Sequence, residues 1–203
     1  AVDIPVIVVG EIREPAMAED ILSSGKADFV ALARPLLADP HWAAKAGRGD
    51  ADRILRCISC DTCRLNLSKN APIRCLINPK LGREQWLDDP EPVSASKKVM
   101  VVGGGPAGME VARVAATRGH QVSLYEAEST LGGGQLALAK APPYKDRLSW
   151  LEDYLANELD RVPVKQHLNT RVDANTVASE APDVLVVATG AAPLIPAIPG
   201  IDG

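Results

Sequence analysis

The chain has 203 residues, of which 46% are hydrophobic and 24% charged, a composition typical of folded globular proteins rather than of disordered or fibrous chains. Its formal net charge is −4, and in the most basic region, 48–64, the basic residues are interleaved with Asp50, Asp52 and Asp61, which argues against binding to nucleic acid. No apolar run approaches the roughly 18 residues of a membrane span, and no signal peptide is recognisable, so we expect a cytoplasmic protein without a membrane partner.

Residues 1–50 predict two strand–helix units. The run 5–9 is apolar and β-branched, as in a parallel strand buried on both faces, and a helix is expected over 15–24. A second buried strand is expected over 29–33 and a second helix between 40 and 46. Two such units cannot close a barrel alone, so we expect an interior piece of a longer polypeptide that exposes a large apolar surface when isolated.

Gly10 and Arg34 follow the two expected strands of this segment. The carboxyl ends of the last strands of a barrel build its phosphate site. Gly10 would let the backbone approach a phosphate, and the Arg34 guanidinium would offer it a fork of donors. A plainer alternative stays open, in which Gly10 only ends a strand and Arg34 pairs with an acidic neighbour such as Asp39.

The segment 51–96 combines a cysteine cluster with a linker over 88–96. All four cysteines of the chain lie here, in the spacing C-x2-C-x2-C-x11-C: Cys57, Cys60, Cys63 and Cys75. Disulfides are not expected in a reducing compartment, which favours metal binding. Three thiolates in one loop and a fourth from another turn are typical of a 4Fe–4S cluster. Zinc more often takes two separated pairs of cysteines, and a structural zinc or free thiols stay alternatives.

The segment 97–203 predicts a nucleotide-binding α/β domain. The pattern indicates, in chain order, a strand over 99–102, a glycine turn and a helix to about 118, a strand over 121–125, an amphipathic helix over 145–160 and a buried strand over 183–190. We interpret the amphipathic helix as a cover for the sheet.

The glycine turn has the spacing of a dinucleotide-binding fingerprint. Gly103 would permit the tight turn, Gly105 the close approach of a pyrophosphate, and Gly108 the close packing of the helix on the strand. Glu126 ends the following strand, where an acid hydrogen-bonds the adenosine ribose and repels a 2′-phosphate. We therefore expect an ADP-containing ligand, with FAD favoured over NAD, although the spacing alone does not separate the two.

Together these motifs resemble a known family. The runs are PVIVVGEI at 5–12, ARPLLADP at 33–40, the cysteine cluster ending in CLINP at 75–79, the glycine turn with Glu126, GGGQ at 132–135 and ATG at 188–190. In this order they resemble the old yellow enzyme-like flavoproteins. More narrowly, they are similar to the subgroup with an iron–sulfur cluster, typified by 2,4-dienoyl-CoA reductase and trimethylamine dehydrogenase.

The resemblance implies an α/β architecture in three parts: 1–50 as the last two βα units of an FMN-binding TIM barrel, 51–96 as the 4Fe–4S segment and linker, and 97–203 as the first part of a Rossmann-like FAD domain. The four cysteines would ligate the cluster. The further residues implied as cofactor contacts are Ala33 and Arg34 with Gly10 at the FMN phosphate, and Ala107, Glu126 and Gln135 at the ADP portion of FAD. The resemblance places the catalytic proton donor outside this chain.

The family also implies an activity. In the reductases, electrons pass from NADPH through FAD and the 4Fe–4S cluster to FMN, which reduces an α,β-unsaturated carbonyl compound. The two residues between Cys60 and Cys63 are instead typical of the amine dehydrogenases, in which electrons start at FMN and ADP fills the nucleotide pocket. We therefore expect an NAD(P)H-dependent reductase acting on a small molecule. The alternatives are an amine dehydrogenase and a non-catalytic nucleotide-binding module with zinc, and the substrate and oligomeric state stay open.

Overall fold

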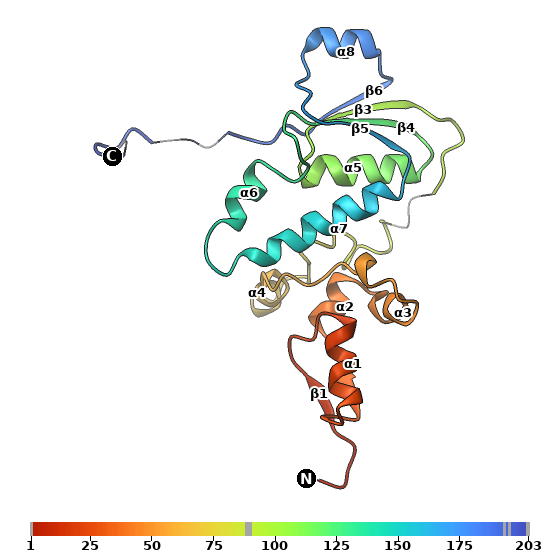
Figure 1. The fold of residues 1–203 in the computed structure, drawn as a ribbon, viewed down its shortest axis with the longest axis vertical. Helices are drawn as coiled ribbons and strands as arrows, with labels where there is room; N and C mark the ends of the chain where they lie inside the picture. Colours follow the sequence, from red (N-terminus) through yellow and green to blue (C-terminus); the bar gives the residue numbers. More distant parts are fainter. Residues whose placement is uncertain (1, 88–90, 193, 195, 202–203) are drawn as a thin grey trace. The chain divides into compact units, whose positions relative to one another are not determined.

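The computed structural model describes residues 2–87, 91–192, 194 and 196–201 (Figure 1). The chain divides into two units, Ala1–Glu91 with Arg147–Glu158, and Pro92–Asp146 with Leu159–Gly203. None of the helices in the described residues combines the length and the apolar content needed to cross a membrane.

The first unit begins with the expected strand–helix alternation. Strands β1 (Ile7–Val9) and β2 (Phe29–Ala31) pair in parallel, and α1 (Pro15–Ser23) connects them. Helix α2 (Arg34–Ala38) follows β2, where only a strand end is predicted, and α3 (Trp42–Gly47) confirms the second expected helix. The remaining elements of this part are η1 (Ala51–Arg53) and α4 (Thr62–Ser68).

Strands β1 and β2 are buried on one face rather than on two. Val8 and Val30 pack against the buried side chains of Ile12, Ala18, Trp42 and Ile54, while Ile7, Val9 and Phe29 are 56–65% exposed. The expectation of burial on both faces is therefore wrong for the described residues. The expected apolar surface is present on the opposite face, as alternation of side chains along a strand requires.

A second apolar cluster lies beneath the cysteine segment. Its buried members are Ala38 of α2 together with Leu55, Ile58 and Ile77. Helix α7 (Ser149–Asp160) packs Trp150 and Tyr154 against it. The interpretation of this helix as a sheet cover is therefore wrong for its first turns, which belong to the first unit.

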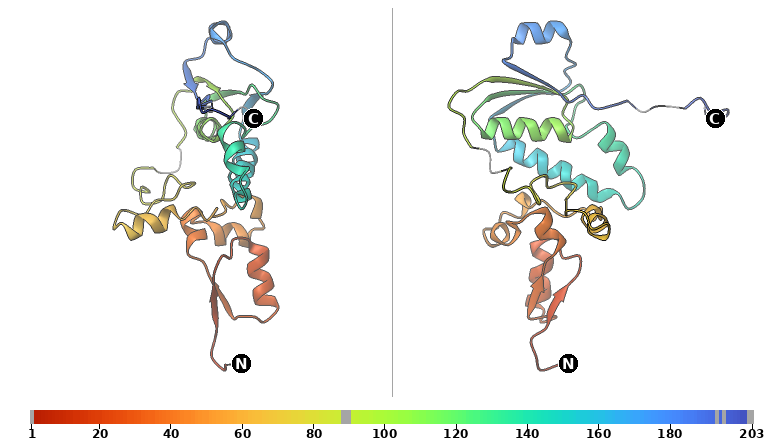
Figure 2. Two further views of the ribbon diagram at one scale, coloured as in Figure 1. Left: turned by 90° about the vertical axis from the view of Figure 1, so that its left-hand side faces the viewer. Right: turned by 180° about the vertical axis from the view of Figure 1, so that it is seen from behind.

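The sheet of the second unit is parallel, in the order β5-β4-β3-β6. Its strands are β3 (Lys98–Val102), β4 (Gln121–Tyr125), β5 (Val164–His167) and β6 (Val184–Val187). The helices of this region are α5 (Pro106–Thr117), α6 (Gln135–Lys140) and α8 (Ala174–Glu180), and η2 is Asp146–Leu148. Figures 1 and 2 show α5 along one face of the sheet and α8 on the other side.

This strand order places a topological switch point between β3 and β6. The chain moves outward from β3 through β4 to β5, then returns to pair β6 with the other edge of β3. In doubly wound sheets, ligands bind at the carboxyl ends of the strands where the order reverses. The glycine turn follows β3 at this point.

Candidate functional site

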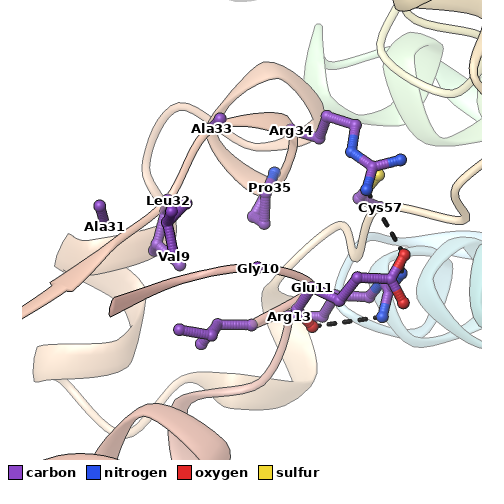
Figure 3. A pocket seen from close by; sticks show the side chains of 11 residues that line it. Val9, Gly10, Glu11, Arg13, Ala31, Leu32, Ala33, Arg34, Pro35 and Cys57 are labelled. Atoms are coloured by element: carbon purple, nitrogen blue, oxygen red, sulfur yellow. Dashed lines mark hydrogen bonds and ion pairs between the residues drawn. The ribbon is translucent and has the colours of Figure 1, made fainter. Parts of the chain in front are cut away.

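A small cavity of the first unit gathers the residues expected at the FMN phosphate (Figure 3). Its volume is about 110 Å³, and its lining includes Gly10, Ala33 and Arg34 together with Cys57. Pockets that enclose a whole drug-sized ligand measure roughly 300–1,000 Å³. The cavity therefore suits the end group of a ligand, such as a phosphate, rather than an entire flavin.

The turn after β1 keeps this cavity open. Gly10 has a φ of +140°, and a Cβ added to it would find no heavy atom within 4 Å. Glu11 follows with a φ of +50°, a left-handed conformation that few residues other than glycine and asparagine adopt. The backbone at Gly10 is accessible to a ligand, in keeping with the role expected for it.

Arg34 lies at the start of α2 and pairs with two carboxylates. Its Nη1 donates to Asp61 Oδ1 at 2.8 Å, and its Nη2 lies 3.4 Å from Glu11 Oε1. The alternative that Arg34 pairs with an acid is therefore observed, but Asp39 is the wrong partner, because it accepts instead from Lys45 and from the Leu55 amide. A guanidinium carries further N–H donors, so these contacts leave Arg34 able to bind a phosphate as well.

Glu11 is a member of the site that the sequence motifs did not indicate. Its carboxylate lies 2.6 Å from Arg13, 3.4 Å from Arg34 and 3.6 Å from Arg147. The hydrogen bond from Arg13 lowers the pKa of Glu11 the most, partial burial opposes it, and the charges of the arginines add to the lowering. Figure 3 shows Glu11 linked to both Arg13 and Arg34. An ionised carboxylate therefore occupies the centre of a group of arginines.

The cysteine segment approaches this cavity through Cys57. Cys57 and Cys75 both pack against the apolar cluster around Ile58 and Ile77, and Cys63 lies in the first turn of α4. All four cysteines are free thiols.

The pKa of the Cys75 thiol is raised above its ordinary value by its surroundings. Burial raises the pKa of Cys75 the most, and the charges of Cys60 and Cys57 raise it further. Hydrogen bonds from the backbone amides of Ile77 and Asn78 lower it. Amides directed at sulfur are among the contacts that tune iron–sulfur clusters.

By the chemistry of their donors, four soft sulfur atoms with amides near one of them, the cysteines would suit a 4Fe–4S cluster, and their ligation of it stays a prediction. Within the described residues, no group of three or more His, Cys, Asp or Glu side chains is arranged to hold a metal ion. The four ligands of a zinc site must converge on one ion, whereas the thiolates of a cubane each bind a different iron atom.

The glycine turn of the second unit has the close contacts that its motif predicts. A Cβ on Gly103 would lie 2.2 Å from the carbonyl oxygen of Ala188, beyond β6, and one on Gly108 would lie 1.8 Å from that of Gly103. A Cβ on Gly105 would meet nothing within 4 Å. Two glycines are thus required by packing, and the third faces open space at the start of α5.

Glu126 is held against this turn by backbone amides. Gly104 donates to its Oε2 at 2.6 Å, and Glu128 donates to its Oε1 at 2.9 Å. A Cβ on Gly104 would lie 2.9 Å from that same Oε2. Gly104 is a residue that the motif spacing missed, although the run of three glycines was a signal for it.

The two remaining expected contacts start separate helices. Ala107 is exposed in the first turn of α5, next to the open Gly105. Gln135 begins α6, and its Nε2 donates to the carbonyl oxygen of Ala191 at 2.8 Å. Their contact with a nucleotide stays a prediction.

Two family models match the chain. Residues 1–53 match the NADH:flavin oxidoreductase / NADH oxidase family, and residues 97–203 match the pyridine nucleotide-disulphide oxidoreductase family. The matches cover the expected barrel segment and the expected nucleotide-binding segment.

Individual relatives span both segments. The chain is 46% identical over 203 residues to an NADH oxidase of Thermoanaerobacter brockii, covering 99% of the chain and 31% of the relative. A structure of 2-naphthoyl-CoA reductase in complex with 2-naphthoyl-CoA matches with a TM-score of 0.91 and 35% identity, over 98% of this chain and 30% of the other. Histamine dehydrogenase from Rhizobium sp. 4-9 matches with a TM-score of 0.85 and 31% identity, over 92% and 28%.

These comparisons confirm the fold expected from the sequence, in which the first unit carries two βα units of a TIM barrel and the second is Rossmann-like. The chain spans about a third of the length of the relatives that it matches. With both family models in the expected order and relatives aligned over nearly every residue, the chain belongs to the old yellow enzyme-like flavoprotein family.

Proposed function

We propose that this chain carries the electron-transfer part of a flavin oxidoreductase, in which electrons pass between NAD(P)H with FAD and FMN through a 4Fe–4S cluster. The proposed reaction of the whole protein is the reduction of an α,β-unsaturated carbonyl compound. The similarity to a reductase bound to an aromatic acyl-CoA supports this substrate class.

One observation carries the proposal. The cavity lined by Gly10, Ala33 and Arg34 is also lined by Cys57, the first residue of the cysteine cluster. The proposed phosphate site and the first proposed cluster ligand would therefore lie side by side within the first unit. Electrons moving between a flavin held here and a cluster held by the cysteines would have a short path.

The residues of the cavity would position the flavin through its phosphate. The Arg34 guanidinium would donate hydrogen bonds to the phosphate, and the open backbone at Gly10 would allow its close approach. The four cysteines would ligate the cluster as thiolates. When bound, the flavins supply hydride and one-electron chemistry, and the cluster supplies one-electron transfer.

The second unit would hold the adenosine diphosphate portion of FAD. Gly105 leaves space for the pyrophosphate at the amino terminus of α5, where the helix dipole favours negative charge. Glu126, already fixed by the amides of Gly104 and Glu128, would accept a hydrogen bond from the ribose. Its negative charge disfavours a 2′-phosphate at this position.

Two observations favour a second candidate function, an amine dehydrogenase. The chain aligns with histamine dehydrogenase over 92% of its length, and the two residues between Cys60 and Cys63 are typical of the amine-oxidising subgroup. In that case electrons would enter at FMN from an amine, and ADP would take the place of FAD.

The deciding experiment uses the full-length protein purified without oxygen. Iron, acid-labile sulfide, FMN and FAD are measured per chain, and the protein is then mixed with NADPH, with NADH or with methylated amines. We expect iron and sulfide in equal amounts, both flavins, and reduction by the nicotinamide followed by reoxidation with an α,β-unsaturated thioester. Reduction by an amine alone would establish the second candidate, and stoichiometric zinc without sulfide would refute both.

A cluster-free variant tests the route of the electrons. Cys60→Ser should lose iron yet keep both flavins, and NADPH should then reduce the FAD without reducing the FMN. Ser68→Ala, in the same segment but at the end of α4, is the control and should behave as wild type. Rapid FMN reduction in Cys60→Ser would refute a route through the cluster.

A further inference from the structure

Two arginines of the barrel segment contact the loop that carries the first three cysteines. Arg13 Nη2 donates to Ser59 Oγ at 2.6 Å, and Arg34 Nη1 donates to Asp61 Oδ1 at 2.8 Å. Ser59 lies between Cys57 and Cys60, and Asp61 lies between Cys60 and Cys63. Each of the two intervals between the first three cysteines is thus attached to the barrel segment by one arginine.

The two attached residues share an unusual backbone conformation. Ser59 has a φ of +54° and Asp61 a φ of +58°. A left-handed conformation is unfavourable for L residues, so it needs support from the surrounding contacts. Ser59 and Asp61 flank Cys60, so their backbone conformations affect how Cys57, Cys60 and Cys63 would be presented to a cluster.

The arginines are themselves well supported. The Arg13 side chain is only 10% exposed, it also donates to the Glu11 carbonyl, and its own carbonyl accepts from the Trp42 indole at 3.0 Å. The Arg34 side chain is 28% exposed and lines the phosphate-sized cavity. Both arginines line the cavity. Arg13 is the more buried of the two and its guanidinium donates to Glu11 and Ser59, whereas the more exposed Arg34 can contact a ligand and the loop at once.

We propose that Arg13 and Arg34 are positioning residues for the iron–sulfur cluster, and that Arg34, shared between Asp61 and the FMN phosphate, couples cluster retention to flavin binding. The inference rests on the proposed function. A bound phosphate would fix the Arg34 guanidinium and thereby strengthen its contact with Asp61. Linkage requires the converse as well, so an ordered loop would strengthen flavin binding by the same factor.

The test separates the side-chain contact from the backbone conformation. Glycine tolerates a positive φ, so Ser59→Gly and Asp61→Gly keep these backbone conformations. Ser59→Gly removes the contact with Arg13, and Asp61→Gly removes the contact with Arg34 together with the longer one from Arg64 at 3.4 Å. Asp61→Asn is the conservative rescue, because asparagine also tolerates this conformation and keeps an oxygen acceptor. Asn70→Gly is the matched control, because Asn70 is exposed, has a φ of +53° and follows α4 in the same segment.

Iron release to a chelator is measured in the full-length protein, both with FMN bound and after FMN has been removed. In the wild type, bound FMN should slow the release. Asp61→Gly should release iron about five-fold faster than wild type with FMN bound, the factor that corresponds to a contact of about 1 kcal/mol, and FMN should no longer slow its release. Ser59→Gly should also release iron faster but keep its response to FMN. Asp61→Asn should lie close to wild type and Asn70→Gly should match it.

The outcomes distinguish this inference from the proposed function. If the wild type contains no iron and no sulfide, the proposed function is refuted, and the positioning role of Arg13 and Arg34 is refuted with it. If the wild type contains iron and all four variants release it at the wild-type rate, only the positioning role of Arg13 and Arg34 is refuted. An unchanged effect of FMN in Asp61→Gly would refute the coupling through Arg34. FAD content, measured in each variant, shows that the second unit is folded.

Discussion

The glycine turn offers a pair of substitutions with opposite expected effects. Gly105→Ala and Gly108→Ala add the same methyl group three residues apart at the start of α5. The methyl on Gly105 would enter open space, and the φ of −72° at this position suits alanine. The methyl on Gly108 would lie 1.8 Å from the carbonyl oxygen of Gly103, well inside any possible contact distance.

The expected magnitudes follow from these distances. In Gly108→Ala the helix and the turn must separate by more than an ångström, and such overpacking costs about 1–3 kcal/mol or more. For a unit of roughly 100 residues, 2 kcal/mol corresponds to a fall of about 8–16 °C in the melting temperature. Gly105→Ala should leave the melting temperature of the nucleotide-free protein unchanged. It should weaken nucleotide binding tenfold or more, which corresponds to about 1.4 kcal/mol, because the methyl occupies the approach of the pyrophosphate.

The assay measures both properties in the full-length protein. Thermal unfolding is followed after removal of FAD, and the dissociation constant for added FAD is measured by the quenching of its fluorescence. Gly47→Ala, which also adds a methyl group in open space at the end of α3, is the control and should change neither quantity. Wild-type affinity for FAD in Gly105→Ala would refute the assignment of this turn as the pyrophosphate site.

Three further predictions concern separate parts of the chain. Arg34→Ala should weaken FMN binding about 10- to 100-fold, as expected for loss of a charged hydrogen-bonding partner. The dissociation constant is measured by titrating the flavin-free protein with FMN, and an unchanged affinity would contradict the role of Arg34 at the phosphate. Trp42→Ala should lower the free energy of unfolding of the first unit by about 3–5 kcal/mol in urea, because Trp42 is only 5% exposed in the core. A loss below about 1 kcal/mol would show that neighbouring side chains fill the space that the indole leaves. Asp173 caps α8, and the hydrogen bond from the Thr176 amide lowers the pKa of the Asp173 carboxyl below its ordinary 3.8. The stabilisation from this contact is therefore complete above pH 3.8 and is lost as the pH falls through the lowered pKa. Asp173→Ala should therefore melt earlier than wild type at pH 7 and approach it in acid, with Asp173→Asn as the control that keeps the cap.

Local patterns predicted the parts of the fold that depend on neighbouring residues. The strand over 121–125 is confirmed residue for residue, since the apolar Val122 and Leu124 alternate with the polar Gln121 and Ser123. The helix expected over 15–24 is confirmed as Pro15–Ser23, and Gly25 follows it with a φ of +67°. In these places the preferences of the side chains and the backbone agree, and no distant contact is needed to decide between structures.

Elements with weak local patterns were missed. Strand β5, Val164–His167, is a strand because it pairs with β4, although two of its four residues are charged or polar and exposed. Helix α2 begins at Arg34 and Pro35. In the sequence, the proline after the strand indicated only the end of that strand, although proline is also suited to the first turn of a helix. Such elements are decided by pairing and packing that a single stretch of sequence does not contain.

In the candidate site, too, contacts between neighbouring residues could be predicted from the sequence and contacts between distant residues could not. The roles of Gly103 and Gly108 could be predicted because both clashes lie within one turn and the strand end beside it. The contacts of Arg13 with Ser59 and of Arg34 with Asp61 join residues 46 and 27 positions apart. From the sequence alone, many other acids and hydroxyls in the chain are equally plausible partners for these arginines. Only the fold selects these partners. Because the fold places Ser59 and Asp61 between cysteines, these two contacts join the cysteine segment to the cavity lined by Arg13 and Arg34.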